Sequence, residues 1–277
     1  MNDKQKRIRL AMEKANLHLN GCELCEHRCL ANRNAGQCGP CKAGTVARVF
    51  RHRVEFSEEL ELSPSHIFYL SGCDMRCKFC ISEENAFDPN RGEVLTGKFL
   101  RRAIDQGEAR GARNIQWLGG EANVHLPQIL AAVAECPRLP PIVWKSNFHM
   151  TPAVFDLLDG IVDVYVADFK FGNDACAIQL ASTDNYVSIV TRNLRLARHR
   201  ADLIVRHLVM PGHLDCCTRP VVEWMSSHLP EVKFSLRGGF IPAWNAKNTP
   251  GLQGYLSADE YRIASQYAES AQLVLIE

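Results

Sequence analysis

From residue 65 onward the sequence alternates between short apolar stretches and longer amphipathic ones. The short stretches are rich in β-branched or aromatic residues and bounded by turn signals, which predicts strands. They are His66–Ser71, Asn114–Leu118, Ile142–Ser146, Val162–Asp168, Leu203–Met210 and Lys233–Leu236. The stretches predicted as helices are Thr96–Ala109, Leu126–Cys136, Thr151–Leu158 and Val187–His199. This repetition predicts an α/β fold with a parallel sheet, either a barrel or an open doubly wound sheet.

The first part of the chain follows a different pattern. Residues 4–20 predict an amphipathic helix, and the segment Cys22 to Cys41 contains few large apolar residues. Such a segment cannot build its own hydrophobic core, so we expect a metal to organise it. Residues 44–64 read as a partly extended connector. We therefore expect a cysteine-rich N-terminal extension over 1–64 and a barrel with a C-terminal segment over 65–277.

Composition limits the classes of protein that fit. A net charge of +1 gives no field that favours nucleic acid, and no apolar run is long enough to span a membrane. The charged N-terminus lacks the apolar centre of an export signal, so we expect a cytoplasmic protein. Twelve cysteines then argue for metal binding rather than disulfides, because eight lie in the first 80 residues. We expect Cys136 to be a small buried residue and give the adjacent Cys216 and Cys217 no firm role.

Cys73, Cys77 and Cys80 form a C-x3-C-x2-C triplet on the loop after the first predicted strand. Three thiolates at this spacing can hold three irons of a [4Fe-4S] cluster and leave the fourth iron open. A zinc site with three cysteines normally takes a nearby histidine as its fourth ligand. His66 is the only histidine close upstream, and it opens the strand instead of lying on the loop. The triplet therefore favours a cluster that binds a cofactor directly.

Polar residues also follow the next predicted strands. Gly119, Gly120 and Glu121 follow the second, where the glycines permit close approach of a ligand and the carboxylate can pair with an ammonium. Ser146 and Asn147 end the third strand, either as ligands of a ribose or carboxylate or as a helix cap before Pro152. The fourth strand ends at Asp168 and Lys170, and the fifth carries Arg206 and His207. Those last two lie on opposite faces, and either one can point into the barrel.

Together these motifs resemble the radical S-adenosylmethionine (SAM) enzymes, and in particular the homologues of pyruvate formate-lyase activating enzyme. The likeness runs from about Cys22 to Pro211 and includes Tyr69–Cys73, Gly119–Pro127, Trp144–Asn147, Val164–Lys170 and Arg206–Gly212. The resemblance implies a partial (β/α)6 barrel of the TIM type, SAM as cofactor, and an electron donor such as flavodoxin or ferredoxin.

The resemblance also assigns residues. It implies that Phe79 lies near the adenine of SAM, that Gly119-Gly120-Glu121 holds the amino group, and that Asp168 and Lys170 lie beside SAM. In activating enzymes the matching aspartate helps to bind a monovalent cation with an acidic residue from the third strand end. Lys145 occupies that position here, so we expect its ammonium to replace the cation and pair with Asp168. We also include His207 among the residues expected to contact the cofactor.

A second metal site is expected at Cys22, Cys25, Cys29, Cys38 and Cys41. Two C-x2-C pairs separated by a loop are a strong metal signal. Zinc and an auxiliary iron–sulfur cluster both fit, and His27 is a further candidate ligand. Five cysteines exceed the four that one site needs.

The sequence thus predicts an anaerobic radical SAM oxidoreductase. It would cleave SAM reductively and take a hydrogen atom from its substrate, which the resemblance suggests is a glycyl residue of a partner enzyme. The alternative substrates are a peptide or a small metabolite. The other class of protein that fits is a non-catalytic zinc or iron–sulfur binding protein. The stretch Arg237–Asn245 is expected to line or cap the barrel mouth.

Overall fold

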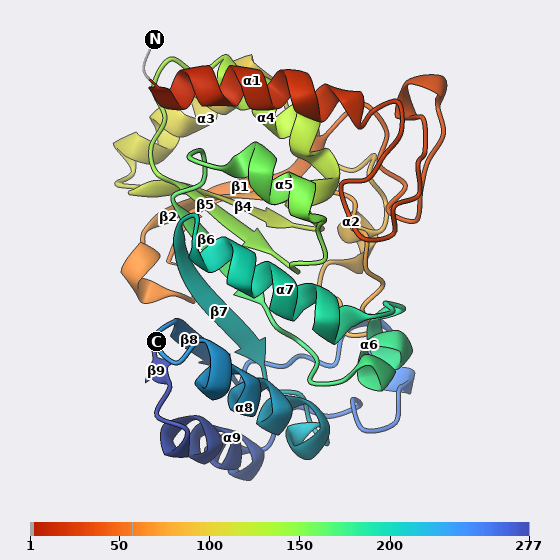
Figure 1. Cartoon of the computed structure of the whole chain (residues 1–277), viewed down its shortest axis with the longest axis vertical. Helices are drawn as coiled ribbons and strands as arrows, with labels where there is room; N and C mark the ends of the chain where they lie inside the picture. Colours follow the sequence, from red (N-terminus) through yellow and green to blue (C-terminus); the bar gives the residue numbers. More distant parts are fainter. Residues whose placement is uncertain (1–2, 57, 277) are drawn as a thin grey trace.

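A computed structural model describes residues 3–56 and 58–276 (Figure 1). Within them, nine strands form one sheet in the order β3-β1-β2-β4-β5-β6-β7-β8-β9. β1 pairs antiparallel with both β2 and β3, and every other pair is parallel. The strands are β1 Arg48–Glu55, β2 Ser65–Leu70, β3 Glu93–Val94, β4 Asn114–Gly119, β5 Ile142–Ser146, β6 Val164–Asp168, β7 Asp202–Leu208, β8 Lys233–Arg237 and β9 Val274–Leu275.

The expected α/β fold with a partial (β/α)6 barrel is confirmed. The six strands predicted from the sequence correspond to β2 and β4 to β8, and their ends differ from the predictions by at most two residues. The strand order is open, because the two edge strands β3 and β9 are not neighbours. Parallel strands run together through β2 and β4 to β8, so their C-terminal ends meet at one edge of the barrel.

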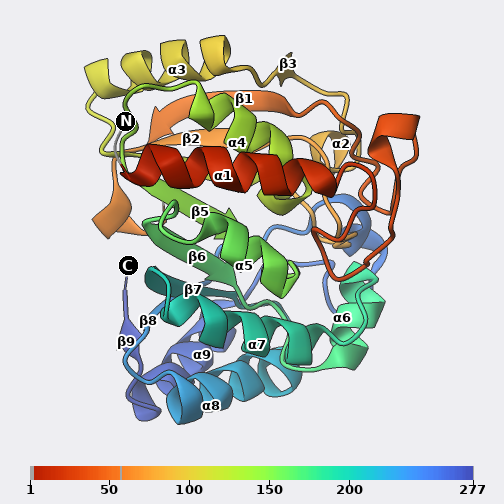
Figure 2. The same cartoon turned by 45° about the horizontal axis from the view of Figure 1, so that its top comes forward.

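Helices cover the outside of the sheet (Figures 1 and 2). They are α1 Asp3–Leu17, α2 Glu83–Ala86, α3 Gly97–Ala109, α4 Leu126–Ala134, α5 Pro152–Leu158, α6 Asp174–Ala181, α7 Tyr186–Arg198, α8 Arg219–His228 and α9 Ala258–Ser270. Several begin at side-chain caps: Thr96 accepts the Phe99 N–H, and Ser257 and Glu260 form a capping box at α9. The sequence analysis did not predict α2, α6, α8 or α9.

The core lies between the sheet and these helices. Phe68, Trp117, Trp144, Tyr165 and Phe234 come from five strands and are buried completely or almost completely. Strands buried on both faces read as near-continuous apolar runs, which is why the sequence located them accurately. The predicted burial of Cys136 is confirmed, and its thiol donates to the carbonyl of Ala132.

The N-terminal segment lies against the barrel. Figure 2 shows α1 running alongside α4, and α1 also packs against α5. The stretch expected to be a connector contains β1, which extends the sheet beyond β2. The boundary between residues 64 and 65 remains a prediction. No helix in residues 3–56 and 58–276 combines the length and apolar character that crossing a bilayer requires.

Candidate active site

The cysteine triplet lines a cavity of about 410 Å³ at the C-terminal ends of the strands. Cys73 is buried, and Cys77 and Cys80 are partly buried on the loop after β2. The described residues that line this cavity include no other cysteine and no histidine. The three sulfurs also do not all lie within 4.8 Å of one another, whereas the ligand atoms of a single zinc ion lie close together. This donor set fits a four-iron cluster with one iron open better than it fits zinc.

Burial controls the protonation of these thiols. It raises the pKa of Cys77 to about 12 and that of Cys73 well above its usual range. The sulfurs are therefore protonated until iron replaces the protons. Phe79, which also lines the cavity, packs its ring against Phe171 and Phe240 at centroid distances of 6.1 and 6.0 Å.

Gly119 and Gly120 bring the end of β4 against the loop that carries the triplet. A Cβ on Gly120 would lie 1.9 Å from the carbonyl oxygen of Gly72, and Gly119 has a φ of +114°. The Glu121 N–H donates to the same Gly72 carbonyl over 2.8 Å. Both glycines are thus required by the approach of two backbone segments, and both line the cavity.

The Glu121 carboxylate is buried at the cavity wall. It accepts the Asn147 N–H over 2.9 Å and the Asn123 N–H over 3.2 Å. Burial, together with the nearby Asp74 carboxylate, raises the pKa of Glu121 to about 8. The carboxyl therefore ionises just above neutral pH, and its ionised form is suited to pair with a ligand ammonium.

Ser146 and Asn147 line the same cavity from the end of β5. Ser146 Oγ accepts from Asn123 Nδ2 and from the Phe148 N–H, each over 2.9 Å. Asn147 Nδ2 donates to Asp74 Oδ1 over 2.8 Å. Neither residue caps α5, whose N-cap is Thr151, so the helix-cap alternative is wrong.

Asp168 and Lys170 lie together in the cavity wall after β6. Asp168 Oδ1 accepts from Arg206 Nε over 2.7 Å, and the other carboxylate oxygen pairs with Lys170. Burial opposes ionisation, but the charges of Arg206 and Lys170 outweigh it and hold the pKa of Asp168 well below its usual range. Asp168 is therefore an anion at neutral pH. Arg206, which the sequence did not select, lines the cavity too.

The expected pairing of Lys145 with Asp168 is wrong. Lys145 Nζ lies 2.8 Å from Glu59 Oε2 and 3.6 Å from Glu58 Oε2. The reason is charge balance: Glu59 is completely buried and lies beside the Lys145 ammonium, whereas Asp168 already has two cations. Lys145 does line the cavity, but its ammonium is paired there with Glu59 and Glu58 and not with Asp168.

His207 points away from the cavity, and the structure does not place it in contact with the cofactor site. It is completely buried, donates from Nδ1 to the Phe169 carbonyl over 2.7 Å, and accepts at Nε2 from Thr218 Oγ1 over 3.0 Å. Of the two neighbouring residues on β7, Arg206 therefore faces the cavity and His207 faces the helices. His66 lies within β2, as expected, and its ring contacts His52.

The five N-terminal cysteines are spread over the segment between α1 and β1. Cys22, Cys25 and Cys41 are buried, Cys29 is partly buried and Cys38 is exposed. No three of them lie within 4.8 Å of one another in the described chain. A buried guanidinium lies among them: Arg33 Nη2 is 3.0 Å from Cys22 Sγ and 3.8 Å from Cys41 Sγ.

A network that the sequence analysis missed joins this segment to the triplet loop. His27 Nε2 donates to the Asp74 carbonyl, and His149 Nδ1 donates to Asp74 Oδ2, each over 2.9 Å. Asp74 is buried directly beside Cys73. The N-terminal segment, the triplet loop and the residues after β5 are thus held together at Asp74, through its backbone carbonyl and its carboxylate.

Three comparisons place this geometry among known proteins. A family model described as the radical SAM superfamily matches residues 67–225. The uncharacterized protein MJ0674 of Methanocaldococcus jannaschii is 34% identical over 275 residues, 96% of this chain and 80% of that protein. The GTP 3',8-cyclase of Synechococcus elongatus is 31% identical over 77 residues, 27% of this chain and 24% of that protein.

Solved structures share the fold. SuiB of Streptococcus suis bound to S-adenosylmethionine aligns with a TM-score of 0.52 at 11% identity, over 74% of this chain. SuiB bound to the precursor peptide SuiA aligns with a TM-score of 0.51 at 11% identity, over 73% of this chain. The alignments cover 47% and 46% of the SuiB chains, so this chain spans about half of their length.

Proposed function

The chain belongs to the radical SAM superfamily, and we propose that it is an enzyme that takes a hydrogen atom from a polypeptide substrate at the mouth of its barrel. The observation that carries the proposal is one cavity lined by three thiols, Glu121 and Asp168, with no further cysteine or histidine among its described lining residues. That wall offers ligands for three irons and polar groups for a charged cofactor.

Each part of the cavity wall has a separate task. Cys73, Cys77 and Cys80 would hold a [4Fe-4S] cluster, which would supply the electron for reductive cleavage of SAM. Glu121 accepts a hydrogen bond from the amino group of SAM. Phe79 packs against the base.

The remaining polar groups hold the rest of the cofactor. Ser146 and Asn147 offer a hydroxyl and an amide to the ribose or the carboxylate of SAM. Asp168 and Lys170 lie beside SAM as an ion pair that is already formed in the cavity wall. Their charges are therefore in position before the cofactor binds.

The N-terminal cysteines are proposed to hold an auxiliary iron–sulfur cluster. Arg33 supports a metal centre there, because a buried guanidinium 3.0 Å from Cys22 Sγ needs negative charge, and metal-bound thiolates provide it. The spread of the five thiols also suits a cluster better than a single zinc ion, which draws four ligand atoms close together. Reducing equivalents would come from a small donor such as flavodoxin or ferredoxin.

The rim of the cavity supports a polypeptide substrate. Phe56, Ile81 and Ile241 line the cavity yet keep 77%, 69% and 48% of their surfaces exposed. They come from three separate segments, and apolar side chains gathered at an opening favour docking of a protein or peptide. A glycyl residue of a partner enzyme is the candidate within this class that the activating-enzyme likeness suggests.

A small anionic metabolite is the second candidate. Arg237 lines the cavity, and its Nη2 is buried without a hydrogen-bond partner among the described groups. A buried guanidinium nitrogen without a partner favours an incoming carboxylate or phosphate. Such a ligand would leave the apolar rim unused.

Two measurements test the proposal. Electron paramagnetic resonance of the reduced protein should change when SAM is added, because SAM binds the open iron; an unchanged spectrum from a fully loaded cluster would argue against cofactor binding. For the substrate, candidate proteins are labelled with deuterium at glycine. Transfer of deuterium into 5'-deoxyadenosine supports a glycyl substrate, and transfer only from a labelled anionic metabolite supports the second candidate.

A further inference from the structure

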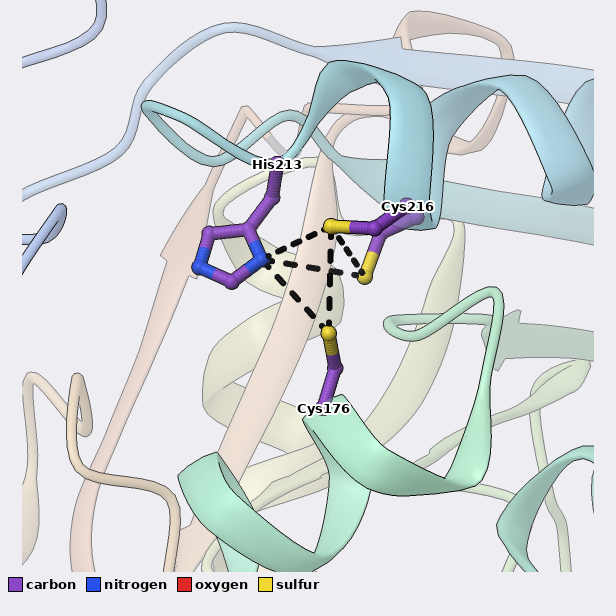
Figure 3. Close-up of side chains that lie close together, drawn as sticks. Cys176, His213 and Cys216 are labelled. Carbon is purple, nitrogen blue, oxygen red and sulfur yellow. Dashed lines mark hydrogen bonds between the residues drawn. The ribbon is translucent and has the colours of Figure 1, made fainter.

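Four ligand-bearing side chains meet outside the cavity described above. Cys176 lies on α6, His213 follows β7, and Cys216 lies on the turn that precedes α8 (Figure 3). Cys217 follows Cys216 on the same turn. All four ligand atoms lie within 4.8 Å of one another. None of the four residues lines the cavity, so this cluster is separate from the triplet and its cofactor.

The distances match tetrahedral coordination of one ion. Cys176 Sγ lies 3.8 Å from Cys216 Sγ, and Cys216 Sγ lies 4.0 Å from Cys217 Sγ. His213 Nδ1 lies 3.7, 3.2 and 4.0 Å from the sulfurs of Cys176, Cys216 and Cys217 respectively. Ideal zinc bonds place two sulfurs about 3.8 Å apart and a sulfur and a nitrogen about 3.6 Å apart.

The backbone is shaped to bring adjacent cysteines to one point. Residues Leu214–Thr218 form a π-helical turn, in which the N–H groups of Cys217 and Thr218 both donate to the His213 carbonyl. π-Helical turns are rare and are frequent at functional sites. The wide turn lets His213, Cys216 and Cys217 face the same space, although two of these residues are neighbours in sequence.

Polar groups around the sulfurs complete the site. Asn173 Nδ2 lies 3.3 Å from Cys176 Sγ and 2.7 Å from the Cys216 carbonyl oxygen. The backbone of Gly172 hydrogen-bonds the Cys217 thiol, and a Cβ on Gly172 would lie 2.6 Å from the Cys217 carbonyl oxygen. Donors of this kind orient metal-bound thiolates and stabilise their charge.

We propose that Cys176, His213, Cys216 and Cys217 bind one zinc ion in a closed Cys₃His site. On binding, three S–H bonds are replaced by three Zn–S bonds and three protons pass to the solvent, with no change of oxidation state. A four-iron cluster does not suit these ligands, because its thiolates must reach separate irons and cannot lie this close together. A site with four protein ligands has no open position, so its role is structural.

Zinc here would fix the loops behind the cofactor site. Thr218, next to Cys217, donates to His207, and His207 donates to the Phe169 carbonyl between Asp168 and Lys170. Gly172 and Asn173, which bond the sulfurs of Cys217 and Cys176, lie on the segment that follows Asp168 and Lys170 at the end of β6. The ion would therefore join α6 to the turn before α8 and hold the strand end that carries Asp168 and Lys170.

The test uses the full-length chain, stripped of metal under anaerobic conditions and supplied with zinc alone. We expect about one tightly held zinc per chain in this site, and X-ray absorption at the zinc edge should show three sulfurs at about 2.3 Å and one nitrogen at about 2.0 Å. Cobalt in place of zinc should give thiolate-to-metal charge-transfer bands. Zinc bound by four sulfurs, or no retained zinc, would overturn the proposal in the wild-type protein itself.

Variants locate the ion. Cys176→Ser and Cys216→Ala should lose this zinc, while Cys136→Ala, a buried cysteine elsewhere, should keep it. Cys22→Ser combined with Cys41→Ser should also keep it, which separates this site from the N-terminal cysteines. The assignment would be contradicted if zinc persisted in Cys216→Ala but was lost from the N-terminal pair variant. It would also be contradicted if mass spectrometry found a Cys176–Cys216 disulfide in the protein as isolated.

Discussion

Arg206 Nε donates to Asp168 Oδ1 over 2.7 Å, and the two residues are register partners on the adjacent strands β7 and β6. The pair therefore forms where two parallel strands end at the cavity. It gives Asp168 a fixed negative charge beside Lys170. This ion pair, rather than one with Lys145, sets the electrostatics of that wall.

Arg206→Gln should weaken both folding and SAM binding, because Asp168 loses one of its two cations. A hydrogen bond to a charged group contributes about 2 kcal/mol, and we expect the free energy of unfolding to fall by about that amount. Denaturant unfolding measures it. Arg198→Gln removes an arginine whose partner Glu231 is exposed, and should cost well under 1 kcal/mol. Equal losses from both variants would refute the special role of Arg206.

SAM affinity should rise with pH through the titration of Glu121. Burial and the Asp74 carboxylate raise its pKa to about 8, so most of the carboxyl is protonated at pH 7. Since the ionised form pairs with the amino group of SAM, the Kd should fall by about fivefold between pH 7 and pH 8. Anaerobic binding titrations follow this, and Glu121→Gln should lose both affinity and most of the slope. A Kd of the wild type that is flat over this range would exclude the assignment.

His207→Gln should change acid stability and leave SAM binding within about twofold. Burial lowers the pKa of His207 to about 4, below an unfolded value of 6.5. The folded state therefore holds the neutral ring: its contribution is complete above pH 6.5 and is lost as pH falls toward 4, up to about 3 kcal/mol. Unfolding free energies from pH 7 to pH 4 should decline less steeply in the variant. A large loss of SAM affinity at pH 7.5 would instead make His207 part of the cofactor site.

Arg33→Gln should reduce the iron held by the N-terminal cysteines. Its guanidinium donates to Cys22 Sγ and to the Val124 carbonyl, so the variant removes the positive charge beside the thiolates. We expect iron per chain to fall toward about four, the content of the triplet cluster alone. The matched control is Arg28→Gln, because the Arg28 guanidinium is half exposed and pairs with the carboxylates of Glu23 and Glu26 rather than with a cysteine. Full iron content in Arg33→Gln would contradict an anionic centre at that site.

The parallel strands and most strand-end residues could be predicted from the sequence. Strands buried on both faces leave long apolar runs, and function at their C-terminal ends follows from parallel topology. β1 was missed because five of the eight residues of Arg48–Glu55 are charged or histidine, and the other three, Val49, Phe50 and Val54, form no continuous apolar run. Its sequence therefore lacks the signal that identified the central strands.

Partners distant in sequence could not be predicted. Lys145 pairs with Glu59 from the segment before β2, a contact that no periodicity encodes. A period of two separates Arg206 from His207 but does not say which of them faces the cavity. Cys176 meets His213 only because α6 and the turn before α8 fold onto each other. In each case the pairing is decided by how distant segments pack in the folded chain.

The central claim is that Cys73, Cys77 and Cys80 support reductive cleavage of SAM in this cavity. The most direct measurement is 5'-deoxyadenosine formed by the anaerobically reconstituted protein with SAM and dithionite, compared with Cys77→Ala and with Cys136→Ala as the control. We predict 5'-deoxyadenosine from the wild type and the control, and a loss of at least about a hundredfold in Cys77→Ala. Equal yields from Cys77→Ala, or none from wild type with a fully loaded cluster, would contradict the account.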